Sequence, residues 1–197
     1  ILNNEKKPAD ISSLRFARSA SAPLSPDIHK KFEKRFGIPI IETMGLTETG
    51  SQITTNPMPP DERKIGSPGK AFGNQIMIGD DQFEVLPAGK TGEILVKGDN
   101  VMKGYFKQPE ETSKTIVNNG WLRTGDLGYL DNDGYVFVSG RIKELIIKGG
   151  ENIAPREIDE ALLAHPSILE AAAFAVPCDD YGEKVEACVC LKEKVSV

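Results

Sequence analysis

Residues 42–50, with the sequence ETMGLTETG, bring hydroxyl groups and a carboxylate together just after the apolar run IPII. Such a run is typical of a short buried strand. Open α/β sheets bind ligands at the carboxyl ends of their strands, and Mg²⁺ takes one or two carboxylates together with substrate phosphate oxygens. The stretch therefore fits a threonine on a phosphate oxygen and a glutamate on Mg²⁺. A hydroxyl-rich turn whose threonines merely cap a helix explains this stretch, taken alone, equally well.

A second set of polar residues surrounds the segment GWLRTGDLGYLDNDGYVFVSGR. Asp126 lies in the glycine-rich sequence TGDLG, where its carboxylate can accept both hydroxyls of a ribose. Arg141 follows fifteen residues later, across a predicted hairpin, and can return to the same ligand. Taken singly, Asp126 as a turn residue and Arg141 as a surface cation at a strand end are the better explanations.

The elements that would carry the first set are of the α/β type. Residues 25–37 predict a helix, with Ser25 as its cap, Pro26 in its first turn, apolar residues every four positions and Gly37 at its end. The residues IPIIE then predict a short buried strand, so the chain opens as a helix that crosses over to a strand.

From about residue 66 the pattern changes to short apolar segments between glycines: NQIMIG, QFEVLPAG, GEILVKG and LGYLDNDGYVFVSG. This spacing predicts an antiparallel sheet or small barrel, in which DNDG is a hairpin turn. A calcium loop at DNDG is excluded, because the glycine comes too early and the required glutamate is missing.

After Arg141 a strand runs into a Gly-Gly loop, Pro155 starts a helix, and AAAFAVP and KVEACVCL predict two further strands. We therefore expect the end of an α/β nucleotide-binding subdomain in residues 1–65 and a small antiparallel β-barrel-like subdomain in residues 66–141. A partial α+β C-terminal domain is expected in residues 142–197.

Composition narrows the classes of partner. The formal net charge of −5 and the scattered Lys and Arg residues favour small molecules over nucleic acid. No window approaches the ~20 apolar residues of a membrane span, and the polar first residues do not resemble a secretory signal. Cys178, Cys188 and Cys190 are too few for a disulfide framework, so we expect a reducing, cytoplasmic location and buried or half-buried thiols.

Taken together, five segments resemble consecutive core motifs of the adenylate-forming superfamily, which contains acyl-CoA synthetases, peptide-synthetase adenylation domains and luciferases. They are SASAPLSP, ETMGLTETG, GEILVKGDNVMKGY, GWLRTGDLGYLDNDGY and GRIKELIIKGGENIAPREIDEAL. The resemblance extends from about Arg15 to Leu191, and the motifs stand in the family's order.

The resemblance implies a nucleotide site and gives each residue a role. Small residues lie against the adenine, an apolar residue lies near the base, and polar groups bind phosphate, ribose and metal. The positions are Ala20, Ser21, Ala22 and Pro23 at the adenine, Met44 and Gly45 beside them, Thr47 on phosphate, Glu48 on Mg²⁺, Asp126 on the ribose, Val138 near the base and Arg141 on the nucleotide. Met44 departs from the aromatic residue that is common at its position.

The resemblance also implies a mobile C-terminal domain. Lys143 matches the hinge between an adenylating and a thiol-transferring pose, and Gly149 and Gly150 match the loop that lines the pantetheine tunnel. With Thr47 and Glu48, the hinge completes the catalytic set.

The implied function is ATP-dependent activation of a carboxylic acid, a fatty acid as the leading expectation, as acyl-adenylate and its transfer to coenzyme A. The cofactors are then ATP or AMP, Mg²⁺ and coenzyme A as co-substrate. Two alternatives stay open: an adenylation domain that loads an acyl or aminoacyl group onto a carrier protein, and a non-catalytic scaffold module.

Two motifs of the family have no counterpart in the sequence. The Ser/Thr/Gly-rich phosphate loop, which lies upstream in relatives, and the lysine near their C-terminus both fail to appear. We therefore expect a fragment cut at both ends, and expect the 197-residue chain alone not to adenylate any acid. A robust pyrophosphate-exchange signal from the purified chain would refute this.

Overall fold

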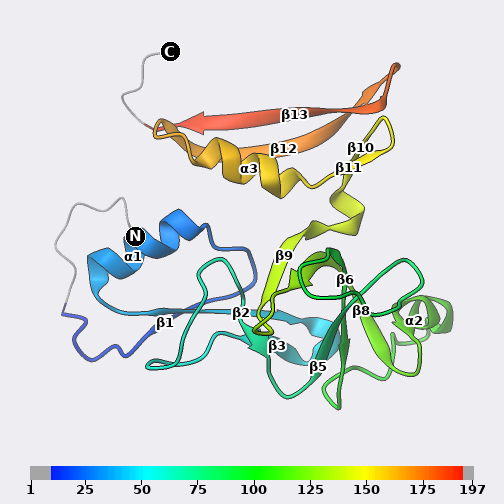
Figure 1. Ribbon diagram of the computed structural model, residues 1–197, viewed down its shortest axis with the longest axis horizontal. Helices are drawn as coiled ribbons and strands as arrows, with labels where there is room; N and C mark the ends of the chain where they lie inside the picture. Colours follow the sequence, from blue (N-terminus) through cyan, green and yellow to red (C-terminus); the bar gives the residue numbers. More distant parts are fainter. Residues whose placement is uncertain (1–9, 193–197) are drawn as a thin grey trace. The chain divides into compact units, whose positions relative to one another are not determined.

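The computed structural model describes residues 10–192, so that the outer ends of the first and last predicted parts lie outside the described residues. The chain divides into two compact units (Figure 1). The first contains the chain up to Thr124 together with Gly128–Val138, and the second contains Gly125–Leu127 and the chain from Ser139 onward. The three-part division expected from the sequence stays a prediction.

The first unit begins with a β-α-β arrangement. Strand β1 (Ala17–Ser19) pairs in parallel with β2 (Ile40–Leu46), and helix α1 (Pro26–Phe36) connects them. Strands β3 (Ser51–Thr55) and β4 (Lys70–Ala71) extend this sheet in the order β1-β2-β3-β4 by antiparallel pairing. The predicted helix is confirmed, including its end at Gly37, whose φ of 68° is left-handed. Ser25 stands at the predicted N-cap position, but its side chain makes no capping hydrogen bond.

Strand β2 is longer than the sequence predicts and includes the first half of the ETMGLTETG stretch. A bulge between Met44 and Gly45 changes its register against β3. A Cβ atom at Gly45 would lie 1.9 Å from the backbone oxygen of Ser51, so the close approach of the two strands requires glycine there. The strand ends in a short 3₁₀ helix, η1 (Thr47–Thr49).

The second sheet of the first unit is formed by β5 (Gln75–Gly79), β6 (Gly92–Lys97), β8 (Trp121–Leu130) and β7 (Ile116–Val117), in that order. Strand β9 (Val136–Arg141) pairs with β8 on the other side of the predicted DNDG turn, and helix α2 (Pro109–Thr115) precedes β7. Ile78, Ile94 and Val136 form its buried core.

The strand predicted over QFEVLPAG is wrong. Val85 is 69% exposed and makes only an isolated bridge to Gly79. Oδ1 of Asp80 accepts hydrogen bonds from the backbone N–H groups of Gln82 and Glu84, and this closes a turn in place of a strand ladder.

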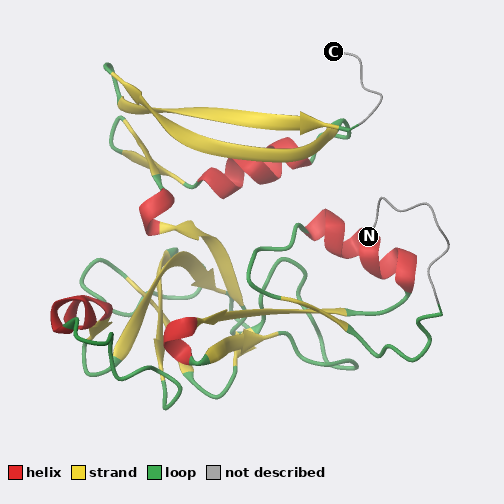
Figure 2. Ribbon diagram, turned by 180° about the vertical axis from the view of Figure 1, so that it is seen from behind, coloured by secondary structure: helices red, strands yellow, loops and turns green. Residues whose placement is uncertain are grey.

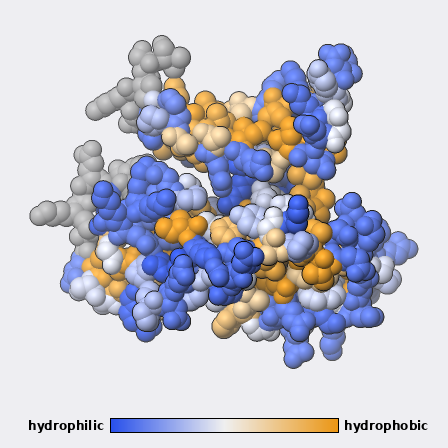
Figure 3. All heavy atoms as spheres, viewed as in Figure 1, coloured by the Kyte–Doolittle hydropathy of each residue, from blue (hydrophilic) through white to orange (hydrophobic). Residues whose placement is uncertain are grey.

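The second unit holds a 3₁₀ helix η2 (Ile142–Glu144), strands β10 (Ile146–Lys148) and β11 (Glu151–Ile153), and helix α3 (Pro155–Leu163). Strands β12 (Ile168–Cys178) and β13 (Gly182–Leu191) complete a sheet of order β11-β10-β13-β12. Figure 2 shows this arrangement of strands and one helix, and Figure 3 shows apolar residues of the unit at its surface.

The expected burial of the thiols is wrong for two of the three cysteines. Cys188 and Cys190 are exposed, and only Cys178 is half-buried. The reason is that α3 packs against β12 and leaves β13 largely uncovered. Across residues 10–192, no group of three His, Cys, Asp or Glu side chains could hold a metal ion.

The expected fold class is confirmed: α/β at the start, then a curled antiparallel sheet, then an α+β part. No helix in the described part of the chain is long and apolar enough to cross a membrane.

Candidate functional site

The turn after β2 separates its two threonines by role. Oγ1 of Thr49 donates to the Leu46 carbonyl at 3.0 Å and accepts from the Leu46 N–H at 3.3 Å, and Thr49 is buried. The Thr47 side chain is exposed, and its hydroxyl has no hydrogen bond to any residue between 10 and 192. The turn-capping explanation left open by the sequence therefore applies to Thr49, while Thr47 is available to a ligand.

Glu48 is held in place by a segment more than fifty residues away. The Tyr105 hydroxyl donates to Oε1 of Glu48 at 2.8 Å, and the Met102 N–H donates to the Glu48 carbonyl at 2.7 Å. The hydrogen bond to this carboxylate, together with burial, raises the pKa of Tyr105, so the phenol stays a donor. Thr112 fixes Tyr105 in turn, because its Oγ1 accepts from the Tyr105 N–H at 2.9 Å.

Sequence reasoning missed Tyr105. The only signal was its place at the end of GEILVKGDNVMKGY, one of the five resembling segments. A hollow of about 570 Å³ beside it is lined by residues of the 103–116 segment. That hollow contains none of the residues to which the resemblance assigns a ligand.

The small residues assigned to the adenine lie directly after β1 at the edge of the first sheet. Ala20, Ser21, Ala22 and Pro23 are all exposed, and Ser21 adopts a left-handed φ of 73°. Because β1 and β2 run parallel, this segment leaves the sheet at the same edge as the end of β2. Thr43 ties the two strands, since its Oγ1 donates to the Ser19 carbonyl at 3.4 Å.

Asp126 and Arg141 meet within the second unit. Nε of Arg141 lies 3.0 Å from Oδ1 of Asp126, and the side chains are 51% and 8% exposed respectively. A buried carboxylate with an adjacent, exposed guanidinium can bind ribose hydroxyls and a nearby phosphate. Val138 belongs to the first unit, where it packs against the Ile78, Ile94 and Val136 core.

The remaining assigned residues of the second unit lie between β9 and β11. Lys143 is exposed in η2, directly after β9. Gly149 and Gly150 form the turn between β10 and β11 with φ values of 59° and 89°, which favour glycine. The Gly149 N–H donates to the Tyr181 carbonyl at 2.9 Å, so this turn is tied to the last residue of the turn between β12 and β13.

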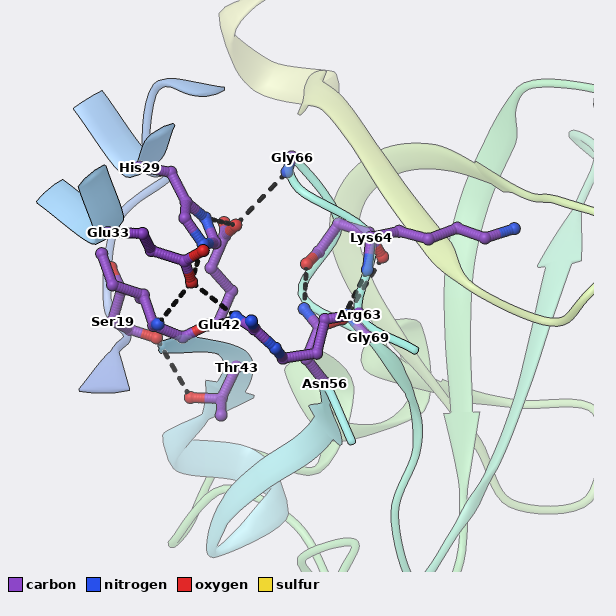
Figure 4. Close-up of polar contacts among 12 residues, drawn as sticks. Ser19, His29, Glu33, Glu42, Thr43, Asn56, Arg63, Lys64, Gly66 and Gly69 are labelled. Carbon is purple, nitrogen blue, oxygen red and sulfur yellow. Dashed lines mark hydrogen bonds and ion pairs between the residues drawn. The ribbon is translucent and has the colours of Figure 1, made fainter. Parts of the chain in front are cut away.

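A partly buried ionic network on the α1 side of the sheet was also missed (Figure 4). His29 Nδ1 lies 2.8 Å from Oε1 of Glu42, and its Nε2 lies 3.0 Å from Oε1 of Glu33. Arg63 donates to the same Glu33 oxygen at 2.6 Å. Burial lowers the pKa of His29, but its hydrogen bonds to Glu42 and Glu33 outweigh burial and raise it. The network fixes α1 and Arg63 to β2, and its β2 member, Glu42, directly precedes Thr43.

The chain matches one family profile and is similar to proteins that are named as CoA ligases. The profile of the AMP-binding enzyme family matches residues 1–106. A sulfoacetate–CoA ligase from Cupriavidus necator is 54% identical over 182 residues, which cover 92% of this chain and 36% of the relative. An oxalate–CoA ligase from Saccharomyces cerevisiae is 43% identical over 98% of this chain and 36% of its own length.

Two solved structures are also similar to this chain in fold and sequence. ATP-bound MatB from Rhodopseudomonas palustris superposes with a TM-score of 0.88 at 39% identity, over 93% of this chain and 36% of that chain. The o-succinylbenzoate CoA synthetase MenE from Bacillus subtilis, in complex with its acyl-adenylate intermediate, gives 0.82 at 38% identity, over 98% of this chain and 39% of its own.

The chain thus spans a little over a third of the length of the relatives that it matches. The resemblance drawn from the five motifs is confirmed by the family profile, which covers more than half of the chain, and by these identities. The chain belongs to the AMP-binding enzyme family, within the adenylate-forming superfamily.

Proposed function

We propose that the protein to which this chain belongs is an AMP-forming acid–thiol ligase that joins a carboxylic acid to coenzyme A at the expense of ATP. The observation that carries the proposal is the turn after β2. There the Thr49 hydroxyl bonds within the turn, Thr47 keeps a free hydroxyl among the described residues, and Glu48 is oriented by Tyr105. A turn that only connected two strands would need neither the free hydroxyl nor the distant tyrosine.

The reaction has two halves. The acid's carboxylate attacks the α-phosphorus of ATP and releases pyrophosphate, and the thiol then attacks the acyl carbonyl of the adenylate and releases AMP. Thr47 donates to a phosphate oxygen, and the small residues 20–23 leave room for the flat adenine ring. Asp126 accepts the ribose hydroxyls, and Arg141 contacts the nucleotide from its exposed position beside Asp126.

Glu48 fits a Mg²⁺ ligand. Its carboxylate is half-buried, and Tyr105 occupies Oε1 only, so that Oε2 stays free of hydrogen bonds from the described residues. A single protein carboxylate suits Mg²⁺, because this ion is commonly bound by one or two carboxylates plus substrate phosphates and water. When bound, the ion neutralises charge on the phosphates during the displacement.

The C-terminal residues serve the second half-reaction. Lys143 is the position about which the domain turns, and Gly149 and Gly150, which lack side chains, let the pantetheine arm pass close to the backbone. A carrier protein in place of coenzyme A remains the alternative acceptor. A cytoplasmic location stays a prediction.

The acid substrate carries a second acidic group in this proposal. The named substrates of three relatives are sulfoacetate, oxalate and 2-succinylbenzoate, and each has two acidic groups. These names favour an acid with two acidic groups over a fatty acid. The fatty-acid substrate expected from the sequence stays a prediction.

The test uses the full-length protein with ATP, Mg²⁺, coenzyme A and a panel of acids that includes sulfoacetate, oxalate, acetate and octanoate. We expect one AMP and one acyl-CoA per acid consumed. The variant Glu48→Gln should lose most of this activity while keeping its melting temperature. Formation of ADP instead of AMP, or no acyl-CoA from any acid, would overturn the proposal.

A further inference from the structure

Arg18 places a guanidinium group across the first sheet. It lies in β1, and its Nε donates to Oγ1 of Thr43 on β2 at 3.2 Å. Its Nη2 donates to Oε1 of Gln52 on β3 at 2.8 Å. One exposed arginine is thus held by side chains from the two neighbouring strands, which fixes its direction.

This guanidinium lies on the face of the sheet opposite α1. Side chains alternate along a strand, and Glu42 points to His29 of α1, so the adjacent Thr43 points to the other face (Figure 4). Arg18 bonds Thr43 and therefore reaches that other face. The ionic network of His29 and the guanidinium of Arg18 are then separated by the sheet.

An ordinary surface arginine is the simpler explanation, but its bonding is unusual for this chain. Four other arginines, at positions 63, 123, 141 and 156, each form an ion pair with a carboxylate. Arg18 has only the neutral acceptors Thr43 and Gln52 among residues 10–192, and its Nη1 has no partner there. Its positive charge is oriented but not neutralised, which is the state that an anion-binding group needs.

The position of Gln52 indicates how close the Arg18 guanidinium lies to the turn that holds Thr47 and Glu48. Gln52 pairs with Gly45 across the β2–β3 ladder, at the base of the turn that holds Thr47 and Glu48. Gly45 is two residues before Thr47, about 7 Å along a strand at ~3.4 Å per residue. An anion bonded by Arg18 beside Gln52 is therefore a short distance from the phosphate-binding turn.

We infer that Arg18, supported by Thr43 and Gln52, binds the second acidic group of a short substrate and so selects acids with two acidic groups over simple monocarboxylic acids. The inference rests on the proposed ligase function. A carboxylate or sulfonate would accept from Nη1 of Arg18, and the Gln52 amide group adds a neutral donor. The planar fork of arginine suits such an oxyanion better than the point charge of lysine.

The test compares steady-state kinetics of the full-length enzyme and its Arg18→Gln variant with sulfoacetate, oxalate and acetate. Loss of a hydrogen bond to a charged group should raise KM for sulfoacetate or oxalate on the order of 10- to 100-fold and leave kcat nearly unchanged. Activity with acetate and KM for ATP should stay within about twofold of the wild type. Arg18→Lys should recover part of the loss.

Arg15→Gln is the matched control, because Arg15 is also exposed, lies three residues away and, within residues 10–192, contacts only the ring of Phe16. It should behave as the wild type. An equal loss by Arg18→Gln on acetate and on the two diacidic substrates would overturn the inference, as would a wild type that accepts only monocarboxylic acids. Absence of acyl-CoA from every acid with the wild type would instead overturn the ligase function itself.

Discussion

The contact between Tyr105 and Glu48 yields a prediction whose size follows from the structure. The substitution Tyr105→Phe removes one oxygen and leaves the ring, so the 2.8 Å hydrogen bond to Glu48 is lost without a large cavity. A hydrogen bond to a charged group contributes about 1.5–3 kcal/mol, and water can replace part of it at the half-buried Glu48. We therefore expect the variant to lose ~1–2 kcal/mol of transition-state stabilisation. This corresponds to about a 5- to 30-fold lower kcat/KM for ATP.

The assay measures AMP formation by the full-length enzyme while Mg²⁺ is varied at fixed ATP. Because Glu48 is the proposed metal ligand, the Mg²⁺ concentration for half-maximal rate should rise, while KM for the acid stays unchanged. Tyr129→Phe makes the same chemical change at a tyrosine that stacks on Phe137 with ring centroids 5.0 Å apart, and it should leave both values unchanged. Identical Mg²⁺ dependence for the wild type and Tyr105→Phe would refute the positioning role.

Three further outcomes are expected. His29→Ala should lower the free energy of unfolding by roughly 3 kcal/mol, because the buried Glu42 carboxylate loses its cationic partner and keeps only the N–H of Gly66 among the described residues. The folded-state pKa of His29 is raised, so this contribution is full below pH ~6.5 and is lost as the pH rises through the folded-state pKa. The urea midpoints of the wild type and the variant should therefore converge at high pH. Thr49→Val should lower the melting temperature, whereas Thr47→Val should lower kcat/KM for ATP and leave melting unchanged; the reverse result contradicts the division of roles. Asp126→Asn should weaken ATP binding about tenfold, measured by calorimetry, with little loss of stability, and unchanged affinity in a destabilised protein would support the turn-residue explanation.

Local pattern was sufficient for the elements with their own start and stop signals. The helix that ends at Gly37 lies where the sequence predicts it, and the strand predicted over residues 38–42 overlaps the first half of β2, which continues to Leu46. The stretch QFEVLPAG has an equally apolar pattern, but the Asp80 side chain closes a turn there by bonding two backbone N–H groups. Periodicity does not register such a competing hydrogen bond.

The features of the candidate site that escaped prediction depend on contacts between distant residues. Tyr105 meets Glu48 across 57 positions, and Arg63 meets Glu33 across 30. Spacing rules describe neighbours on one helix or strand, so neither pair leaves a local signal. The exposure of Cys188 likewise depends on where α3 packs, which the alternation within β13 does not reveal.

The tight approach of Gly45 to Ser51 limits how substrate choice can be altered by protein engineering. With backbone oxygen 1.9 Å from where a Cβ would stand, position 45 admits no side chain unless the strands separate. A mutant library aimed at new acids should therefore keep this glycine and diversify the opposing Gln52, together with Arg18. Substrate selectivity can then be changed at the β2–β3 ladder while the turn after β2, which holds Thr47 and Glu48, keeps its shape.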